Sequence, residues 1–120
     1  MRHIGAIAAF AAVALATAAQ AHPQLRAASP TPGSALAASP PEIRITFNEP
    51  LVAAFSGLEL KDRAGKSVDI GRSAVDPKTR RQIVAPIKAP LAAGTYTVDW
   101  HAVAADTHHV SGHYSFHVKR

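Results

Sequence analysis

Short runs of alternating apolar and polar residues, each ended by proline, glycine, asparagine or aspartate, recur along this chain and restrict its fold more than any other feature. The clearest run covers residues 42–47, where Ile43, Ile45 and Phe47 share one face, and it stops before Pro50. No segment keeps a helical period. We therefore expect an all-β domain of about seven strands, an Ig-like antiparallel β-sandwich or Greek-key barrel.

The expected strands are joined by turn-rich segments. Residues 29–41 are rich in proline, glycine and serine, and residues 71–79 are polar, so both are expected to be irregular connections. Residues 62–65 are typical of a hairpin turn. The expected strands cover residues 22–28, 42–47, 58–61, 66–70, 81–87 and 95–100, and a last segment that ends at Val118.

The N-terminus has the pattern of a secretory signal. Arg2 provides a positive start, residues 4–17 form an apolar run, and Ala19-Gln20-Ala21 fits the small-residue rule for signal peptidase. We expect residues 1–21 to be cleaved and residues 22–120 to form one small domain exported to the periplasm. An uncleaved N-terminal anchor is the alternative, although the apolar run is short for a membrane span.

Charge and composition limit the possible partners and ligands. The chain has 13 Lys and Arg against 8 Asp and Glu, and the basic residues are scattered except around Lys78, Arg80 and Arg81. We interpret this excess as a solvated surface and expect no nucleic-acid partner. There is no cysteine, and Met1 is the only methionine. A metal site in the mature domain would therefore use nitrogen and oxygen donors, without the thioether donors that favour Cu(I).

Residues 100–118 contain the strongest signal of a binding site. Four of the seven histidines fall between positions 108 and 117, next to a polar turn between two alternating segments. Side chains two residues apart on an extended or turning backbone point to the same side, so Asp106 and His108 can converge on one ion. Asp106 could instead cap the turn with its own hydrogen bonds.

Signal cleavage would provide the remaining donors. With His22 as the first residue, its free α-amine and its imidazole Nδ1 can chelate the same ion, and Pro23 has no amide hydrogen to extend that chelate. Together with Asp106 and His108, this gives three nitrogens and one oxygen. Such a set suits tetragonal Cu(II) better than Zn(II).

The chain resembles the CopC family of periplasmic copper-resistance proteins over essentially all of residues 22–120. The motifs that carry the resemblance are His22-Pro23-Gln24-Leu25, Ser29-Pro30-Thr31-Pro32-Gly33, Phe47-Asn48-Glu49-Pro50-Leu51, residues 93–100, Asp106-Thr107-His108 and Ser111-Gly112-His113-Tyr114-Ser115-Phe116. One departure is His109, which stands where relatives commonly have proline.

The resemblance implies an Ig-like barrel that binds one Cu(II) ion through His22, Asp106 and His108, with Glu49 supporting the site from behind. It also implies a carrier or buffer in copper resistance, with an inner-membrane copper transporter of the CopD type as a partner. We expect a monomer of the Cu(II)-only type without enzymatic activity.

Two other functions fit some of the same residues. An N-terminal histidine chelate resembles the histidine brace of copper polysaccharide monooxygenases, but an Asp ligand would fill the position that oxygen chemistry needs. A metal-independent Ig-like interaction module is the other alternative. His109 and the further histidines His101, His113 and His117 are expected to be polar surface. The aromatic residues at inward positions, Tyr96, Trp100, Tyr114 and Phe116, are expected to be core.

Overall fold

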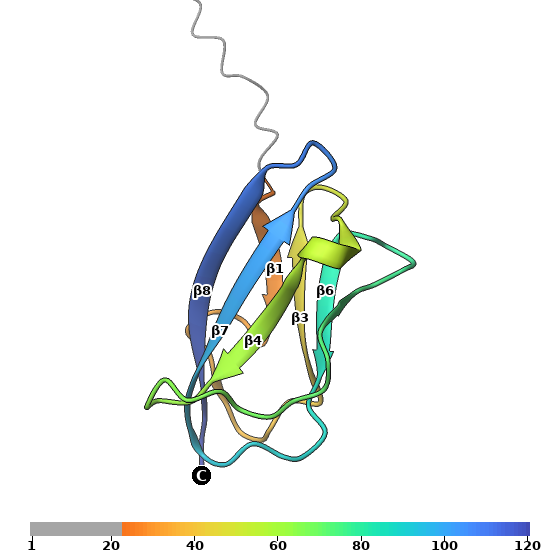
Figure 1. Ribbon diagram of the computed structural model, residues 1–120. Helices are drawn as coiled ribbons and strands as arrows, with labels where there is room; N and C mark the ends of the chain where they lie inside the picture. Colours follow the sequence, from red (N-terminus) through yellow and green to blue (C-terminus); the bar gives the residue numbers. More distant parts are fainter. Residues whose placement is uncertain (1–22) are drawn as a thin grey trace, which may run out of the picture.

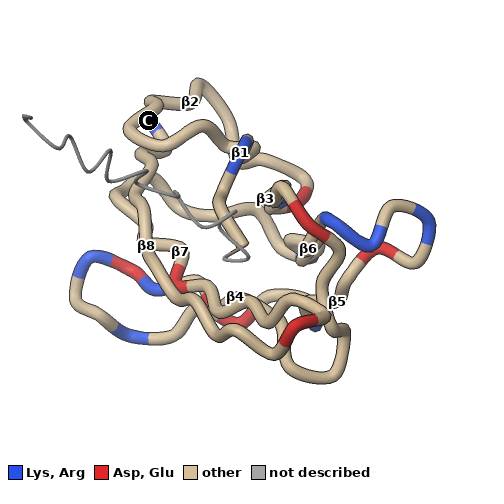
Figure 2. Tube along the Cα trace, turned by 90° about the horizontal axis from the view of Figure 1, so that it is seen from above, with Lys and Arg blue, Asp and Glu red and all other residues tan. Residues whose placement is uncertain are grey.

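Two four-stranded sheets pack face to face in the computed structural model, which describes residues 23–120 (Figures 1 and 2). The first sheet contains, in spatial order, β1 (Leu25–Ser29), β3 (Glu42–Phe47), β6 (Gln82–Pro86) and β5 (Ala74–Val75). The second sheet contains β2 (Ala35–Leu36), β8 (His109–Val118), β7 (Gly94–Val103) and β4 (Gly57–Lys61). A single 3-10 turn, η1 (Ala53–Phe55), precedes β4. The predicted all-β fold is confirmed.

The inward face of each strand forms the core, as the alternation predicts. In β3 every second residue is buried, and the same pattern continues in β6, β7 and β8. The four aromatic residues expected in the core are each at most 8% exposed, and the Trp100 ring meets Phe47 edge-on with their centroids 5.0 Å apart. Apolar burial at these positions is the main force that holds the two sheets together.

The predicted hairpin between residues 58–61 and 66–70 forms only in part. Asp62 caps the turn by accepting hydrogen bonds from the amides of Ala64 and Lys66, but pairing with β4 ends after the Lys61–Ser67 bridge and the bond from Val68 N to Leu60 O. Residues 68–73 then cross to the first sheet, where Gly71 N donates to Pro86 O. A segment that changes sheets cannot continue pairing with β4, so the predicted strand 66–70 was wrong.

Two short strands lie in segments that were expected to be irregular. β5 falls within residues 71–79, and β2 falls within residues 29–41. β2 pairs with β8 in parallel, so the expectation of a wholly antiparallel fold was also wrong. The cause is that the proline-rich connection runs along the open edge of β8, where Gly33 N donates to Ser115 O and His117 N donates to Ser34 O. Two-residue strands carry no alternation from which to predict them.

One end of the sandwich collects segments that are distant in sequence. β1 runs antiparallel to β3, so the start of β1 lies beside the end of β3, and Figure 1 shows the β7–β8 turn at this same end. Gln24 N donates to the side chain of Asn48, and Asn48 N donates back to Gln24 O. Pro23 is fully buried there. We call this end, where β1 begins, the N-terminal end of the sandwich.

Within residues 23–120, no helix is long and apolar enough to cross a membrane.

Candidate metal centre

The turn between β7 and β8, residues 104–108, carries the two predicted donors. Thr107 N donates to Ala104 O at 2.8 Å, and Ala104 N donates to His108 O at 3.3 Å, which closes a tight loop between the strand ends. Thr107 has a positive φ of 72°. That conformation is unusual for a β-branched residue, and the Thr107 hydroxyl, which donates to Asp106 O, holds the adjacent peptide.

Asp106 and His108 face each other across this turn. Asp106 Oδ2 lies 2.8 Å from His108 Nδ1, and Asp106 Oδ1 accepts a hydrogen bond from the His108 amide at 3.2 Å. The hydrogen bond to the His108 side chain, followed by that to its amide, holds the pKa of Asp106 below its ordinary value. The carboxylate therefore caps the turn with one oxygen while the other meets the imidazole. Capping of the turn by Asp106 is thus compatible with the predicted role of this residue as a metal ligand.

The separation of these two atoms fits a shared ion. Donors about 2.0 Å from a metal and at right angles to each other lie about 2.8 Å apart. The same distance between Asp106 Oδ2 and His108 Nδ1 also fits a hydrogen bond, with a proton between the two atoms in place of a metal ion. The pair is also accessible, because the side chains of His108 and Asp106 are 52% and 35% exposed.

The segment after β3 braces the turn from below. Leu51 forms an antiparallel bridge with Ala104, and Val52 N donates to Val103 O at 2.7 Å. Ser56, the one buried polar residue among residues 23–120, accepts a hydrogen bond from Val103 N at 3.0 Å. The role of Ser56 depends on a contact 47 residues away, which local patterns do not reveal.

Glu49 lies in this same segment, after the end of β3. Its Oε2 atom is buried, and it has no hydrogen-bond partner among the described residues. A buried carboxylate oxygen without a partner is costly, and such atoms are uncommon in folded proteins. Glu49 therefore carries an unsatisfied hydrogen-bond acceptor at the N-terminal end of the sandwich.

His22 lies outside the described residues, as do all the residues of the predicted signal peptide. Among residues 23–120 there is no group of three or more His, Cys, Asp or Glu side chains placed to hold a metal ion. Of the predicted ligands, Asp106 and His108 are the two that lie among the described residues.

The other described histidines occupy the outer face of the second sheet. His113 pairs with Asp99, whereas His101 pairs with Ser111, so the two histidines are offset rather than opposite each other. Asp99 forms an ion pair with Lys61 at 2.8 Å. His109 is exposed at the start of β8, and His117 Nδ1 lies 3.1 Å from Thr95 Oγ1. The expectation that these histidines are polar surface is in keeping with this geometry.

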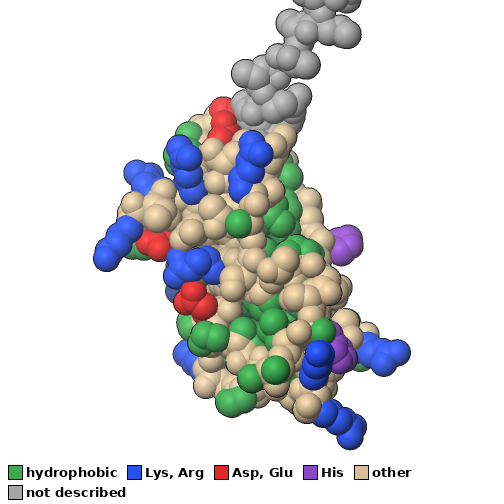
Figure 3. Space-filling model, turned by 180° about the vertical axis from the view of Figure 1, so that it is seen from behind, with side chains coloured by type: hydrophobic (Ala, Val, Ile, Leu, Met, Phe, Trp, Pro, Cys, Tyr) green, Lys and Arg blue, Asp and Glu red, His purple; other side chains and the backbone are tan. Residues whose placement is uncertain are grey.

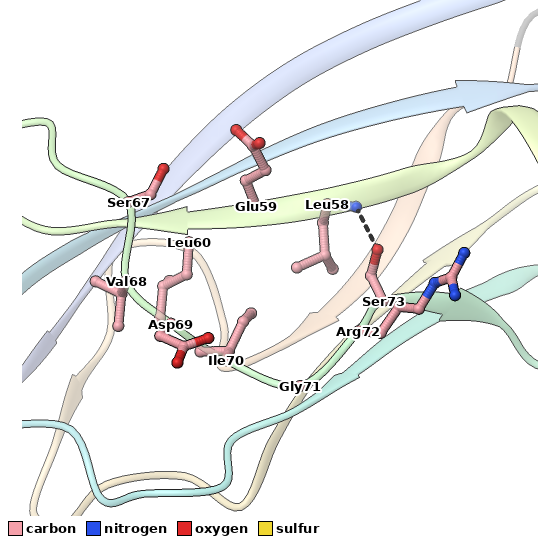
Figure 4. Close-up of a pocket in the computed structure, with 10 residues that line it drawn as sticks. All are labelled: Leu58, Glu59, Leu60, Ser67, Val68, Asp69, Ile70, Gly71, Arg72 and Ser73. Carbon is pink, nitrogen blue, oxygen red and sulfur yellow. Dashed lines mark hydrogen bonds between the residues drawn. The ribbon is translucent and has the colours of Figure 1, made fainter.

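A hollow of about 390 Å³ lies beside β4, at the crossing segment 67–73 (Figure 4). It includes the carboxylates of Glu59 and Asp69, but Figure 4 shows Glu59 pointing to the other side of β4 from Asp69. Arg72 also points outward. Because these charged groups diverge, the hollow lacks the convergent donors that a metal site needs.

Comparison with known proteins identifies the family. The model of the CopC domain matches residues 25–119. This chain belongs to the CopC family. It is 43% identical to Copper resistance protein C of Pseudomonas syringae pv. tomato, over 92% of this chain and 91% of that protein. The predicted membership of a copper-resistance family is confirmed.

A solved structure and a longer relative add to this comparison. The crystal structure of PcoC, a methionine-rich copper resistance protein from Escherichia coli, superposes with a TM-score of 0.74 and 38% identity, covering 82% of this chain and all of that one. Copper transport protein CutJ of Bacillus subtilis is 30% identical over 77% of this chain but only 17% of its own length. A CopC-like segment is thus a small part of that longer protein.

Proposed function

We propose that the chain, once processed to begin at His22, is a periplasmic carrier or buffer that binds one Cu(II) ion. The ligands are the α-amine and imidazole of His22, the carboxylate of Asp106 and the imidazole of His108. The observation that carries this proposal is the 2.8 Å approach of Asp106 Oδ2 to His108 Nδ1 on a braced, accessible turn. The start of β1, two residues after Pro23, lies at the same end of the molecule.

Glu49 and the absence of methionine from the mature chain also support a site for Cu(II). The unsatisfied oxygen of Glu49 would orient a ligand from behind, as buried carboxylates often do in metal sites. Nitrogen and oxygen donors in a tetragonal set favour Cu(II). PcoC is described as methionine rich, whereas the only methionine here is Met1, in the predicted signal. We therefore infer a protein of the Cu(II)-only type.

The wider role follows from export and from the relatives. Cleavage after Ala21 would release a monomeric domain that acts without catalysis. The presence of a CopC-like segment within the longer copper transport protein CutJ supports a membrane copper transporter as the partner. We propose that the chain presents copper to such a transporter.

The deciding experiment is a Cu(II) titration, followed by electron paramagnetic resonance, on the chain that begins at His22. A matched chain carries one extra alanine before His22 and is acetylated at that alanine, which removes the terminal amine and keeps the His22 imidazole. The acetyl group is needed because a free Ala-His terminus would form a different copper chelate from its amine, the His22 amide and the imidazole. We expect one tightly bound ion with couplings to several nitrogens, and weaker binding with fewer nitrogens in the extended chain. His113→Gln is the control and should bind as the unmodified chain does. Equal affinity and identical spectra for the processed and extended chains would refute the proposed ligands.

A further inference from the structure

An apolar tip projects next to the candidate metal centre. It is the 3-10 turn η1, residues 53–55, which has no buried residue. Phe55 is 61% exposed, the one large hydrophobic side chain among residues 23–120 that is so exposed. Ala53 and Ala54 beside it are exposed as well. Covering this aromatic side chain with an apolar phase would remove its apolar surface from water and is therefore favourable.

The tip is held firmly in this exposed position. The amide of Val52, before η1, bonds to Val103, and the hydroxyl of Ser56, after it, accepts from the same residue. Both ends of the tip are therefore fixed to β7, three residues before Asp106. These bonds keep the backbone of the turn that carries Phe55 at the surface.

A rim of basic residues lies alongside. Arg80 O accepts from Leu51 N at 2.7 Å, and Arg81 O accepts from Phe47 N at 2.8 Å, which places the 78–81 loop against the base of the tip. Lys78, Arg80 and Arg81 are all exposed. The nearby carboxylate of Asp76 pairs with Arg44 and also accepts a hydrogen bond from the Lys78 amide, so it offsets only part of this positive charge. Figure 3 shows several Lys and Arg side chains over the upper part of the molecule.

We propose that this tip and rim form a docking surface for an anionic phospholipid bilayer. A projecting aromatic side chain can enter the acyl boundary while the cations beside it contact the headgroups. One aromatic residue and three cations give an expected association constant on the order of 10⁴ M⁻¹, as for a single acyl chain, which is marginal and reversible. Weak attachment of this kind suits a protein that must leave the membrane again. Docking through this surface would also turn the 104–108 loop toward the bilayer.

Copper should strengthen this attachment, a part of the inference that rests on the proposed function. A dipositive ion bound beside Asp106 adds positive charge to the same end of the molecule. The copper-loaded chain should therefore bind an anionic surface more tightly than the copper-free chain. Attachment of the copper-free chain tests the surface independently of the metal site.

The experiment is flotation of the chain beginning at His22 with vesicles of equal phosphatidylglycerol and phosphatidylcholine, and with vesicles of phosphatidylcholine alone. We expect binding to the anionic vesicles, weakened by added salt. Phe55→Ser should reduce it about tenfold, and the double variant Arg80→Gln/Arg81→Gln by a similar factor. Asp106→Asn removes a negative charge from this end, so its copper-free binding should be slightly tighter, and it should lose most of the further increase caused by copper.

The control is Arg63→Gln/Lys66→Gln, which removes the same charge from the turn after β4, at the opposite end of the molecule (Figure 1). It should leave vesicle binding nearly unchanged. Equal losses in the two charge variants, with no loss in Phe55→Ser, would show attraction by overall charge and overturn the proposal. Absence of binding to anionic vesicles would also overturn it, and a protein partner would then be the occupant to test.

Discussion

At the scale of single residues, Asp106 serves two purposes with its two carboxylate oxygens. Oδ1 accepts from the backbone of the turn, and Oδ2 meets the imidazole of His108. An amide at this position preserves one acceptor oxygen and the shape of the side chain but removes the negative charge. The substitution therefore separates the structural role of Asp106 in the turn from its proposed role as a metal ligand.

Asp106→Asn should leave the fold intact and weaken Cu(II) binding at least tenfold, because a neutral amide oxygen is a poorer ligand than a carboxylate. Calorimetric titration measures the affinity, and thermal unfolding without copper checks the fold. Asp99→Asn, on the outer face of β7, is the matched control and should bind copper normally. A normal affinity in Asp106→Asn would remove this residue from the site.

The affinity should also depend on pH in a defined direction. Hydrogen bonds from His108 lower the pKa of Asp106, so its carboxylate stays ionised well below neutrality and loses its contribution to stability only as the pH falls through that lowered value. Imidazole ligands, by contrast, must be deprotonated, and the reference pKa of histidine is about 6.5. Copper affinity measured between pH 5 and 8 should fall as the pH drops toward and below about 6.5. A constant affinity across this range would argue against imidazole ligands.

At the scale of elements, β7 and β8 form the longest paired strands, and their register determines which side chains meet. Trp100 lies opposite Gly112, and a Cβ added at Gly112 would stand 2.5 Å from the indole ring. The glycine therefore provides the space in which the ring packs against β8 and meets Phe47. This close contact secures the strands just below the 104–108 turn.

Gly112→Ala should destabilise the domain by about 1–3 kcal/mol, because the added methyl group overpacks this contact. The midpoint of denaturant unfolding measures the loss, with fluorescence of Trp100, the single tryptophan, as the probe. Ser111→Ala changes the adjacent exposed residue of β8 and should shift stability by less than about 0.5 kcal/mol. An equal effect in the two variants would indicate that the indole moves aside without cost.

At the scale of the whole molecule, the sandwich gathers residues from three separate parts of the chain. Gln24 bonds to Asn48, beside Glu49, while Leu51 and Ser56 bond to the end of β7 that carries the Asp106 turn. In the proposed site, copper would link the mature N-terminus to this turn. Binding should then stabilise the folded state as a whole.

Copper at 100 times its dissociation constant should add about 2.7 kcal/mol to the free energy of unfolding. For a domain of this size, that corresponds to a rise in Tm of about 10–20 °C. Differential scanning calorimetry of the chain beginning at His22, with and without Cu(II), measures this rise. The acetylated chain with an extra N-terminal alanine should gain much less. An identical gain in both chains would place the stabilising ion elsewhere.

The sequence alone determined the strands with clear alternation and their inward aromatic residues, because side-chain direction along a strand repeats every two residues. It also predicted that Asp106 and His108 lie on the same side, and the structure brings them together through a turn with Thr107 at positive φ. The tertiary structure decided the parallel pairing of β2, the early end of the 58–70 hairpin, the contact between Trp100 and Gly112, and the brace from Ser56 to Val103. These features depend on register and on contacts between distant segments, and such contacts exist only once the sheets have paired and packed.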